Sequence, residues 1–206
     1  MVFMAPDYSV VVTKGRLEAF SDGVFAVIIT IMVLELKVPH GSDWAALEPL
    51  VPVFLVYILS FVFIGIYWTN HHHMLHVTDR INGAILWANL HLLFWLSLVP
   101  FVTGWMGENH FAPVPTAVYG GVLFGAAIAY TILARLIIAY QGPHSRLKEM
   151  TGRDIKGYIS LVIYIVAIPS AFVHQLISDA LYLTVALIWL VPDRRIESKL
   201  NASPRA

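Results

Sequence analysis

Three polar side chains at the start of an apolar stretch are the first candidates for chemistry. Glu18, Ser21 and Asp22 lie near its N-terminal end, and the residues that follow, as far as Leu36, are mostly apolar. An ionisable group at membrane depth is unfavourable by several kcal/mol unless it is paired or hydrated. Asp22 therefore marks either a buried polar network or an ion path. Ser21 has no base close in sequence, so Ser21 and Asp22 do not form a nucleophile arrangement.

A histidine cluster at residues 71–76 is the second candidate. His72 and His76 are four residues apart and could share one face of a helix, a spacing that zinc can use. Membrane di-iron oxygenases use several histidine boxes, whereas this chain has one cluster and no accompanying Glu-x-x-His pair. The sequence therefore predicts no metal site. It favours a cluster at a helix C-terminus, where the helix dipole stabilises imidazolium, with a pH-responsive role because histidine titrates near neutrality.

Other catalytic signals are missing from the sequence. It contains no cysteine, no Gly-x-Ser-x-Gly motif, no phosphate-binding loop and no dinucleotide fingerprint. The formal net charge is zero, so no basic surface argues for a nucleic-acid partner. We therefore predict that the protein is not an enzyme and uses no cofactor.

The composition indicates that these residues are positioned by helices in a membrane. Hydrophobic residues make up 58% of the chain, charged residues only 13%, and the mean hydropathy is +0.73. Soluble domains carry about 25% charged residues. A helix needs roughly 20 apolar residues to cross a bilayer. Six stretches approach this length, and they predict an all-α integral membrane protein with a single domain over residues 1–206: 17–36, 50–71, 83–105, 116–139, 158–173 and 176–191.

The distribution of basic residues predicts the orientation. With six crossings, 12 of the 13 Lys and Arg residues fall on one side of the membrane, and Lys37 alone falls on the other. Cytoplasmic loops are enriched in Lys and Arg. We therefore expect a multi-pass protein of the cell membrane with both termini in the cytoplasm.

The first stretch carries an apolar stripe. At about 100° per residue, Val27, Ile31 and Leu34 fall on one side of a helix, and Thr30 flanks them. Asp22 lies about 140° from the centre of this stripe. The residues alone favour a stripe that faces lipid or packs against another helix, with Asp22 facing neighbouring helices.

Four motifs carry a resemblance to a known family. They are Arg16 with Phe20-Ser21-Asp22-Gly23, Tyr67-Trp68-Thr69-Asn70-His71-His72, Trp87-Ala88-Asn89-Leu90 and Leu98-Val99-Pro100-Phe101. The first three predicted helices resemble the endosomal and lysosomal transmembrane potassium channel family, in particular its prokaryotic members with one six-helix repeat. The last three helices match that family only in number and apolar character.

The resemblance implies a homotetramer in which the first helix of each subunit lines a central pore. Val27, Ile31 and Leu34 then correspond to an apolar constriction, with Thr30 beside it as a contributor to selectivity. The sequence has no Gly-Tyr-Gly carbonyl filter. The resemblance also implies a structural network that holds the helices together, with these members: Arg16, Phe20, Ser21, Asp22, Trp68, His71 or His72, and Asn89.

The function implied is a leak-type, potassium-permeable cation channel. An apolar ring offers a cation no ligands, so a narrow ring dewets and blocks the pore until it widens. Without an acidic ring or a carbonyl cage, we expect only a modest preference for K⁺ over Na⁺. The expected partners are further copies of the chain, the lipid bilayer, and K⁺ with other monovalent cations.

Two alternatives come from other functional classes. The first is a proton- or cation-coupled secondary transporter in which Asp22 and the histidines act as a relay. Such carriers often have broken helices and inverted repeats, whereas the first stretch has no central Gly or Pro break and the sequence shows no repeat. The second is a histidine-box membrane enzyme, which the single cluster disfavours.

Overall fold

The structure is a computed structural model that describes residues 13–142, 145–151 and 154–190. All regular elements in these ranges are helical, which confirms the all-α fold class. In chain order the elements are α1 (Lys14–Leu34), the 3₁₀ helix η1 (Trp44–Leu50), α2 (Val51–His76), α3 (Gly83–Ser97), α4 (Val99–Glu108), α5 (Pro113–Gln141), α6 (Arg146–Thr151), α7 (Ile155–Ser170) and α8 (Gln175–Leu190).

Four helical spans of the described chain are long and apolar enough to cross a membrane: Lys14–Leu34, Trp44–His76, Gly83–Glu108 and Pro113–Gln141. The helices α7 and α8 are apolar but have only 16 residues each. At about 1.5 Å per residue they extend about 24 Å, less than the roughly 30 Å of a bilayer core. The last predicted stretch ends at Val191, which lies outside the described residues. The count of six crossings stays a prediction.

The predicted stretch 83–105 is divided into two helices at Leu98. Pro100 explains the break, because its nitrogen cannot donate to the carbonyl of Leu96 and its ring disfavours a continuous helix. The two helices together span Gly83–Glu108.

Local sequence signals fix several helix starts. The side chain of Asn82 accepts a hydrogen bond from the backbone N–H of Ile85 at 2.9 Å, and Asp154 accepts one from Gly157 at 2.9 Å. These are N-caps of α3 and α7, and they satisfy donors that a helix start leaves free. Pro113 begins α5, where its missing N–H costs nothing.

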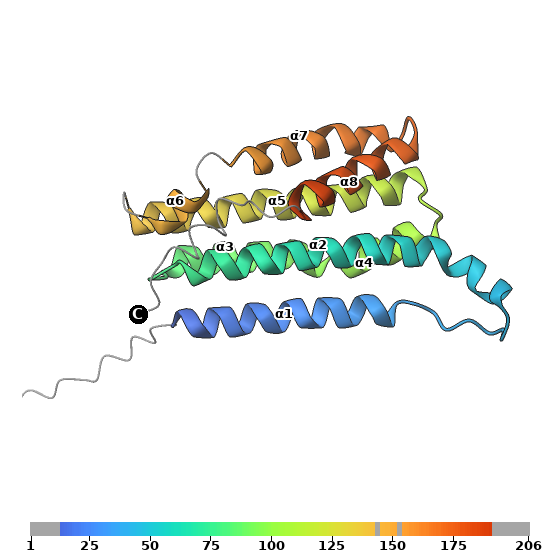
Figure 1. Cartoon of the computed structure of the whole chain (residues 1–206), viewed down its shortest axis with the longest axis horizontal. Helices are drawn as coiled ribbons and strands as arrows, with labels where there is room; N and C mark the ends of the chain where they lie inside the picture. Colours follow the sequence, from blue (N-terminus) through green and yellow to red (C-terminus); the bar gives the residue numbers. More distant parts are fainter. Residues whose placement is uncertain (1–12, 143–144, 152–153, 191–206) are drawn as a thin grey trace, which may run out of the picture.

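The helices lie side by side, with α1 along one edge of the bundle and α7 and α8 along the other (Figure 1). Small residues on α5 permit close packing between them. A Cβ at Gly125 would overlap the ring of Trp95, and one at Gly120 would overlap the Tyr182 side chain. Helices in lipid commonly approach each other at such glycines.

The ends of the bundle differ in charge. Figure 1 places the start of α1, the α2–α3 connection and α6 at one end, and the connection between α1 and η1 at the other. Arg16, Arg80 and Lys148 therefore lie at the opposite end from Lys37.

Candidate functional site in the first helix

One face of α1 packs into the bundle. Its buried residues recur every three or four positions and are Leu17, Ser21, Phe25, Ile28 and Met32. This spacing produces a single helix face, and α1 contacts α2, α3 and α4. Met32 is only 2% exposed, so it belongs to the core.

The apolar stripe lies on the outside of the single chain. Val27 is 56% exposed, Ile31 42% and Leu34 76%. The stripe is centred about 110° around the helix from the buried face. Thr30 is exposed beside it and donates its hydroxyl hydrogen to the carbonyl of Ala26 at 2.8 Å. A contiguous apolar surface of this kind needs lipid or another protein surface to cover it.

A buried chain of hydrogen bonds attaches the inner face of α1 to two other helices. Ser21 donates to the carbonyl of Leu17 at 2.8 Å and accepts from the Asn89 amide nitrogen at 3.0 Å. The Asn89 amide oxygen lies 2.7 Å from Nε2 of His71. Ser21 and Asn89 are fully buried and His71 is 1% exposed. The network therefore joins α1, α3 and α2 away from water.

The order of donors in this network is determined by its chemistry. Ser21 uses its hydrogen on a backbone carbonyl, so its oxygen must accept from the Asn89 amide. The Asn89 oxygen is then the acceptor for His71, which requires a hydrogen on Nε2. Removing one member would leave a buried donor or acceptor unsatisfied, which costs about 1–3 kcal/mol.

Asp22 lies outside this buried chain and makes a separate contact. Its Oδ1 accepts a hydrogen bond from the Trp68 indole nitrogen at 3.0 Å. Trp68 stacks on the His72 ring, with ring centroids 6.0 Å apart and an interplanar angle of 28°. This second contact between α1 and α2 is exposed on the single chain.

Two expected members of the network remain outside it. Arg16 and Phe20 are exposed on α1, and Phe20 is 54% exposed. Within the described ranges, the Arg16 side chain makes no hydrogen bond or ion pair, and only its backbone N–H donates, to the carbonyl of Thr13 at 3.0 Å. The structure therefore brings together Ser21, Asn89 and His71 as one group and Asp22, Trp68 and His72 as another.

The histidine cluster forms the last turns of α2. The rings of His72 and His76 stack with centroids 6.2 Å apart. Among the residues that the structure describes, no three His, Asp or Glu side chains could hold a metal ion together.

Sequence reasoning missed a second buried polar group. The Ser60 hydroxyl lies 2.7 Å from the Thr103 hydroxyl and 3.0 Å from the Tyr119 hydroxyl, which links α2, α4 and α5. The only signal in the sequence is one polar residue among several in each apolar stretch. Such a residue does not identify its partners, because they come from distant helices.

It also missed an ion pair at the end of the bundle opposite the histidines. Nζ of Lys37 lies 2.5 Å from a carboxylate oxygen of Glu108. The hydrogen bond and the negative charge of Glu108 raise the pKa of Lys37. The pair connects the segment after α1 to the end of α4.

The fold and the site define an integral membrane protein whose first helix is anchored by buried polar residues and presents an apolar stripe outside the single chain. Its sequence identifies it more narrowly. Residues 16–100 match the family described as endosomal/lysosomal potassium channel TMEM175, a range that contains every predicted site residue. A Chryseobacterium protein named potassium channel HX13_20290 is 58% identical over 189 residues, which are 92% of this chain and 98% of that protein. This chain belongs to the TMEM175 family.

Other relatives agree with this membership. A Streptomyces collinus protein named potassium channel B446_29190 is 39% identical over 58% of this chain and 62% of its own length. The human endosomal/lysosomal proton channel TMEM175 is 38% identical over 40% of this chain and 19% of its own length. The crystal structure of a lysosomal potassium-selective channel TMEM175 homolog from Chamaesiphon minutus superposes with a TM-score of 0.72 at 29% identity, over 88% of this chain and 97% of that one.

Proposed function

We propose that this protein is a potassium-permeable cation channel of the cell membrane, in which four copies of α1 surround a central pore. The observation that carries the proposal is the division of α1 into two faces. Ser21 on the inner face is tied to Asn89 and His71, whereas Val27 and Ile31 remain exposed. The names of the bacterial relatives, including the 58% identical potassium channel, support K⁺ as the permeant ion.

The proposed barrier is an apolar constriction made by Val27, Ile31 and Leu34. A narrow ring of these side chains excludes water when closed, because it offers neither water nor ions a hydrogen bond or a charge. Opening widens or rotates the ring until hydrated cations pass. We expect conduction of the leak type, in which ions move passively down their gradient once the ring has widened.

Selectivity arises beside the constriction and at its entrances. The Thr30 hydroxyl donates to its own helix, so its oxygen lone pairs remain available to a passing cation. The sequence has no Gly-Tyr-Gly motif whose carbonyl groups could replace the hydration shell of the ion, and a modest preference for K⁺ over Na⁺ follows. The two groups of hydrogen bonds around Ser21 and Asp22 keep α1 in position and do not contact the ion.

Recordings from purified full-length protein in planar bilayers test the proposal. We expect unitary currents in symmetrical KCl, and a reversal potential under K⁺/Na⁺ gradients that indicates a modest K⁺ preference. A pH gradient imposed across the same bilayer measures proton permeation, which the name of the vertebrate relatives makes relevant. Cross-linking or mass photometry of the same sample should give a tetramer.

The alternative of a secondary transporter predicts a different result. A carrier would move K⁺ in vesicles without unitary currents, and its flux would follow the pH gradient with a fixed stoichiometry. That outcome would overturn the channel proposal. A dimer or monomer that conducts normally would contradict the tetrameric pore and leave the channel function in place.

A further inference from the structure

A cavity lies on the side of the bundle away from α1. Its 13 lining residues come from α2, α5, α7 and α8, together with the cap residue of α7, and none comes from α1. The space between its lining residues that no atom fills is about 490 Å³ when the open solvent at its mouth is included, and only a small part of it is enclosed. The α2 residues Phe63, Ile66, Tyr67 and Asn70 follow each other at the spacing of one helix face. The cavity is therefore separate from the proposed pore.

Five aromatic side chains form most of its wall: Phe63, Tyr67, Tyr130, Tyr164 and Trp189. Three of them are held by hydrogen bonds. The Trp189 nitrogen donates to the Ser160 hydroxyl at 2.9 Å, the Tyr130 hydroxyl lies 3.4 Å from the Asn70 carbonyl, and the Tyr67 hydroxyl lies 3.5 Å from the Leu123 carbonyl. The rings are fixed before any ligand arrives, so binding loses little side-chain freedom.

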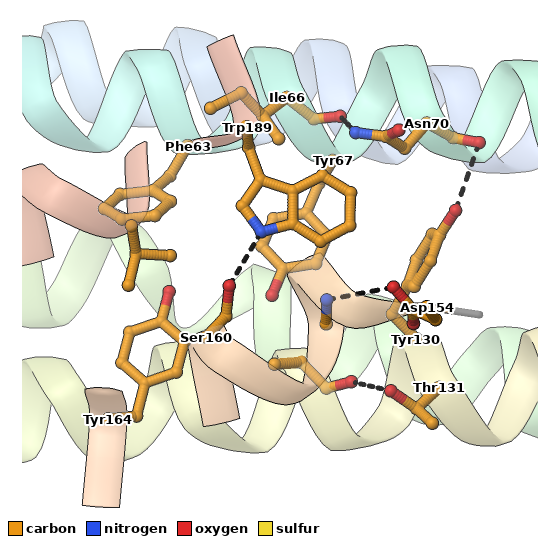
Figure 2. Close-up of a pocket in the computed structure, with 13 residues that line it drawn as sticks. Phe63, Ile66, Tyr67, Asn70, Tyr130, Thr131, Asp154, Ser160, Tyr164 and Trp189 are labelled. Atoms are coloured by element: carbon orange, nitrogen blue, oxygen red, sulfur yellow. Dashed lines mark hydrogen bonds between the residues drawn. The ribbon is translucent and has the colours of Figure 1, made fainter. Parts of the chain in front are cut away.

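Among the polar aromatic side chains of the wall, only Tyr164 has no hydrogen-bond partner in the described residues. Tyr164 is 2% exposed, and the described part of the chain provides no hydrogen bond to this hydroxyl. In Figure 2 the hydroxyl points into the space between Phe63 and Ser160. The Tyr164 oxygen is not among the fully buried side-chain atoms that lack a partner in the described residues, so it is accessible from the cavity and free to bond a group there. Its unmet hydrogen-bonding capacity indicates that a polar group belongs in the cavity.

One carboxylate gives the cavity its charge. Asp154 lines it and is half-buried, and no Lys, Arg or His is among the described lining residues. Oδ1 of Asp154 accepts from the Gly157 N–H, which holds the carboxylate at the start of α7. Aromatic faces attract cations through the ring quadrupole, and they favour weakly hydrated organic cations. The aromatic wall and the negative charge of Asp154 therefore both favour an organic cation as the ligand.

We propose that this cavity binds a small organic ammonium ion, of the size of a trimethylammonium group with a short polar arm. The aromatic rings surround the cationic head, the Asp154 carboxylate balances its charge, and the Tyr164 hydroxyl bonds the polar arm. Asp154, the cap of α7, and Asn70, in the last turns of α2, belong to its lining, and these ends of the two helices point toward the end of the bundle where α1 begins (Figure 1). The site would therefore be reached from the side that the charge distribution assigns to the cytoplasm.

Choline and its neutral isostere 3,3-dimethylbutan-1-ol are the probes for this site, because they share a shape and differ in charge. Binding of each to full-length protein in a maltoside detergent is measured by saturation-transfer NMR titration. We expect choline to bind about tenfold or more tighter than the neutral alcohol. Asp154→Asn should weaken choline binding about tenfold, since Asn keeps the helix cap and removes only the charge.

Two further variants distinguish binding in the cavity from a general effect of lost negative charge on choline binding. Asp79→Asn makes the same change at an exposed acid in the α2–α3 connection, outside the cavity, and should leave choline binding unchanged. Tyr164→Phe removes only the hydroxyl and should weaken choline binding but not binding of tetramethylammonium, which has no polar arm. The proposal is overturned if choline does not bind, if choline and the alcohol bind equally, or if Asp154→Asn binds choline like the unaltered protein.

Discussion

The side chain of Asp22 connects the first helix to a neighbouring helix. Its carboxylate accepts from Trp68 on the exposed side of the single chain, away from the buried Ser21–Asn89–His71 chain. In the proposed tetramer this side faces neighbouring helices. A hydrogen bond to a charged group contributes about 1.5–3 kcal/mol. Asp22 is therefore better placed to hold helices together than to contact the ion.

We predict that Asp22→Ala reduces the recovery of tetramers and that Asp22→Asn reduces it less, because Asn retains an oxygen that can accept from Trp68. Channels that do assemble should keep near-normal selectivity. Size-exclusion chromatography of the purified variants measures recovery, and reversal potentials measure selectivity. Normal assembly combined with an altered K⁺ preference would mean that Asp22 faces the ion.

The buried chain gives a separate prediction about stability. Asn89→Ala should remove the acceptor of His71 and the donor to the Ser21 oxygen, at a cost of about 1–3 kcal/mol for each unsatisfied group. For a chain of this size, the sum of about 2–6 kcal/mol corresponds to a fall in Tm of about 4–24 °C. The matched control is Leu90→Ala, at the next position of α3, where the side chain is 41% exposed. Equal Tm values for the two variants would contradict the assigned role of Asn89.

At the scale of single elements, the sequence predicted some features well because they are local. The stripe of Val27, Ile31 and Leu34 follows from helical periodicity alone, and the structure places all three outside the single chain. Ser21 stands out as a polar residue at the start of an apolar stretch, whereas Asn89 is identified only through the family motifs. Their hydrogen bond depends on how α1 and α3 cross, which periodicity does not determine.

Other features could not be read from the sequence, because they depend on several helices at once. The Ser60–Thr103–Tyr119 group requires the packing of α2, α4 and α5, and nothing in its own stretch distinguishes any of the three from the other polar residues there. The aromatic cavity requires four helices and the cap of α7. For Arg16 and Phe20 the sequence predicted too much. The family motif includes both residues in the network, but the single chain gives their side chains no partner there.

We predict that Ile31 forms the tightest apolar ring of the pore. It lies in the middle of the stripe, about 6 Å along the helix axis from Val27, and it is the least exposed of the three residues. Ile31→Ser or Ile31→Asn should raise the basal current and weaken selectivity, because a polar ring lowers the barrier to water and ions. Ile31→Phe should block the pore. Single-channel conductance and reversal potential in planar bilayers provide the test.

The neighbouring Met32 is the control for the rotation of α1. Met32 is buried against the bundle, so Met32→Ser should lower stability more than it alters permeation. If Met32→Ser changes permeation while the Ile31 variants do not, the helix is rotated relative to this assignment. If neither position affects permeation, α1 does not line the path.

At the scale of the whole molecule, charge separates the two ends of the bundle. Lys37 lies at one end and pairs with Glu108, whereas Arg16, Arg80 and Lys148 lie at the other (Figure 1). Cytoplasmic ends of membrane proteins are enriched in Lys and Arg. The distribution along the sequence and the arrangement of the helices therefore favour the same orientation.

We predict that a cysteine at Arg146 is labelled only from the cytoplasmic side and a cysteine at Ser42 only from outside. The native chain contains no cysteine, so each variant presents a single thiol. Both positions are exposed, whereas the nearby Ser145 is 2% exposed. A Cβ at Gly107 would overlap the backbone of Val53, so Gly107→Cys would disturb packing.

The same labelling tests the number of crossings. Ser203 near the C-terminus lies outside the described residues, and Ser203→Cys reports directly on the side that the chain reaches after α8. Six crossings place it with Arg146→Cys, and labelling both with a membrane-impermeant maleimide in intact and permeabilised cells compares them. Over their described residues, α7 and α8 are each about 6 Å shorter than a bilayer core. If Ser203→Cys is labelled in intact cells while Arg146→Cys is not, one of these short helices does not cross, and the orientation of the first four spans still stands.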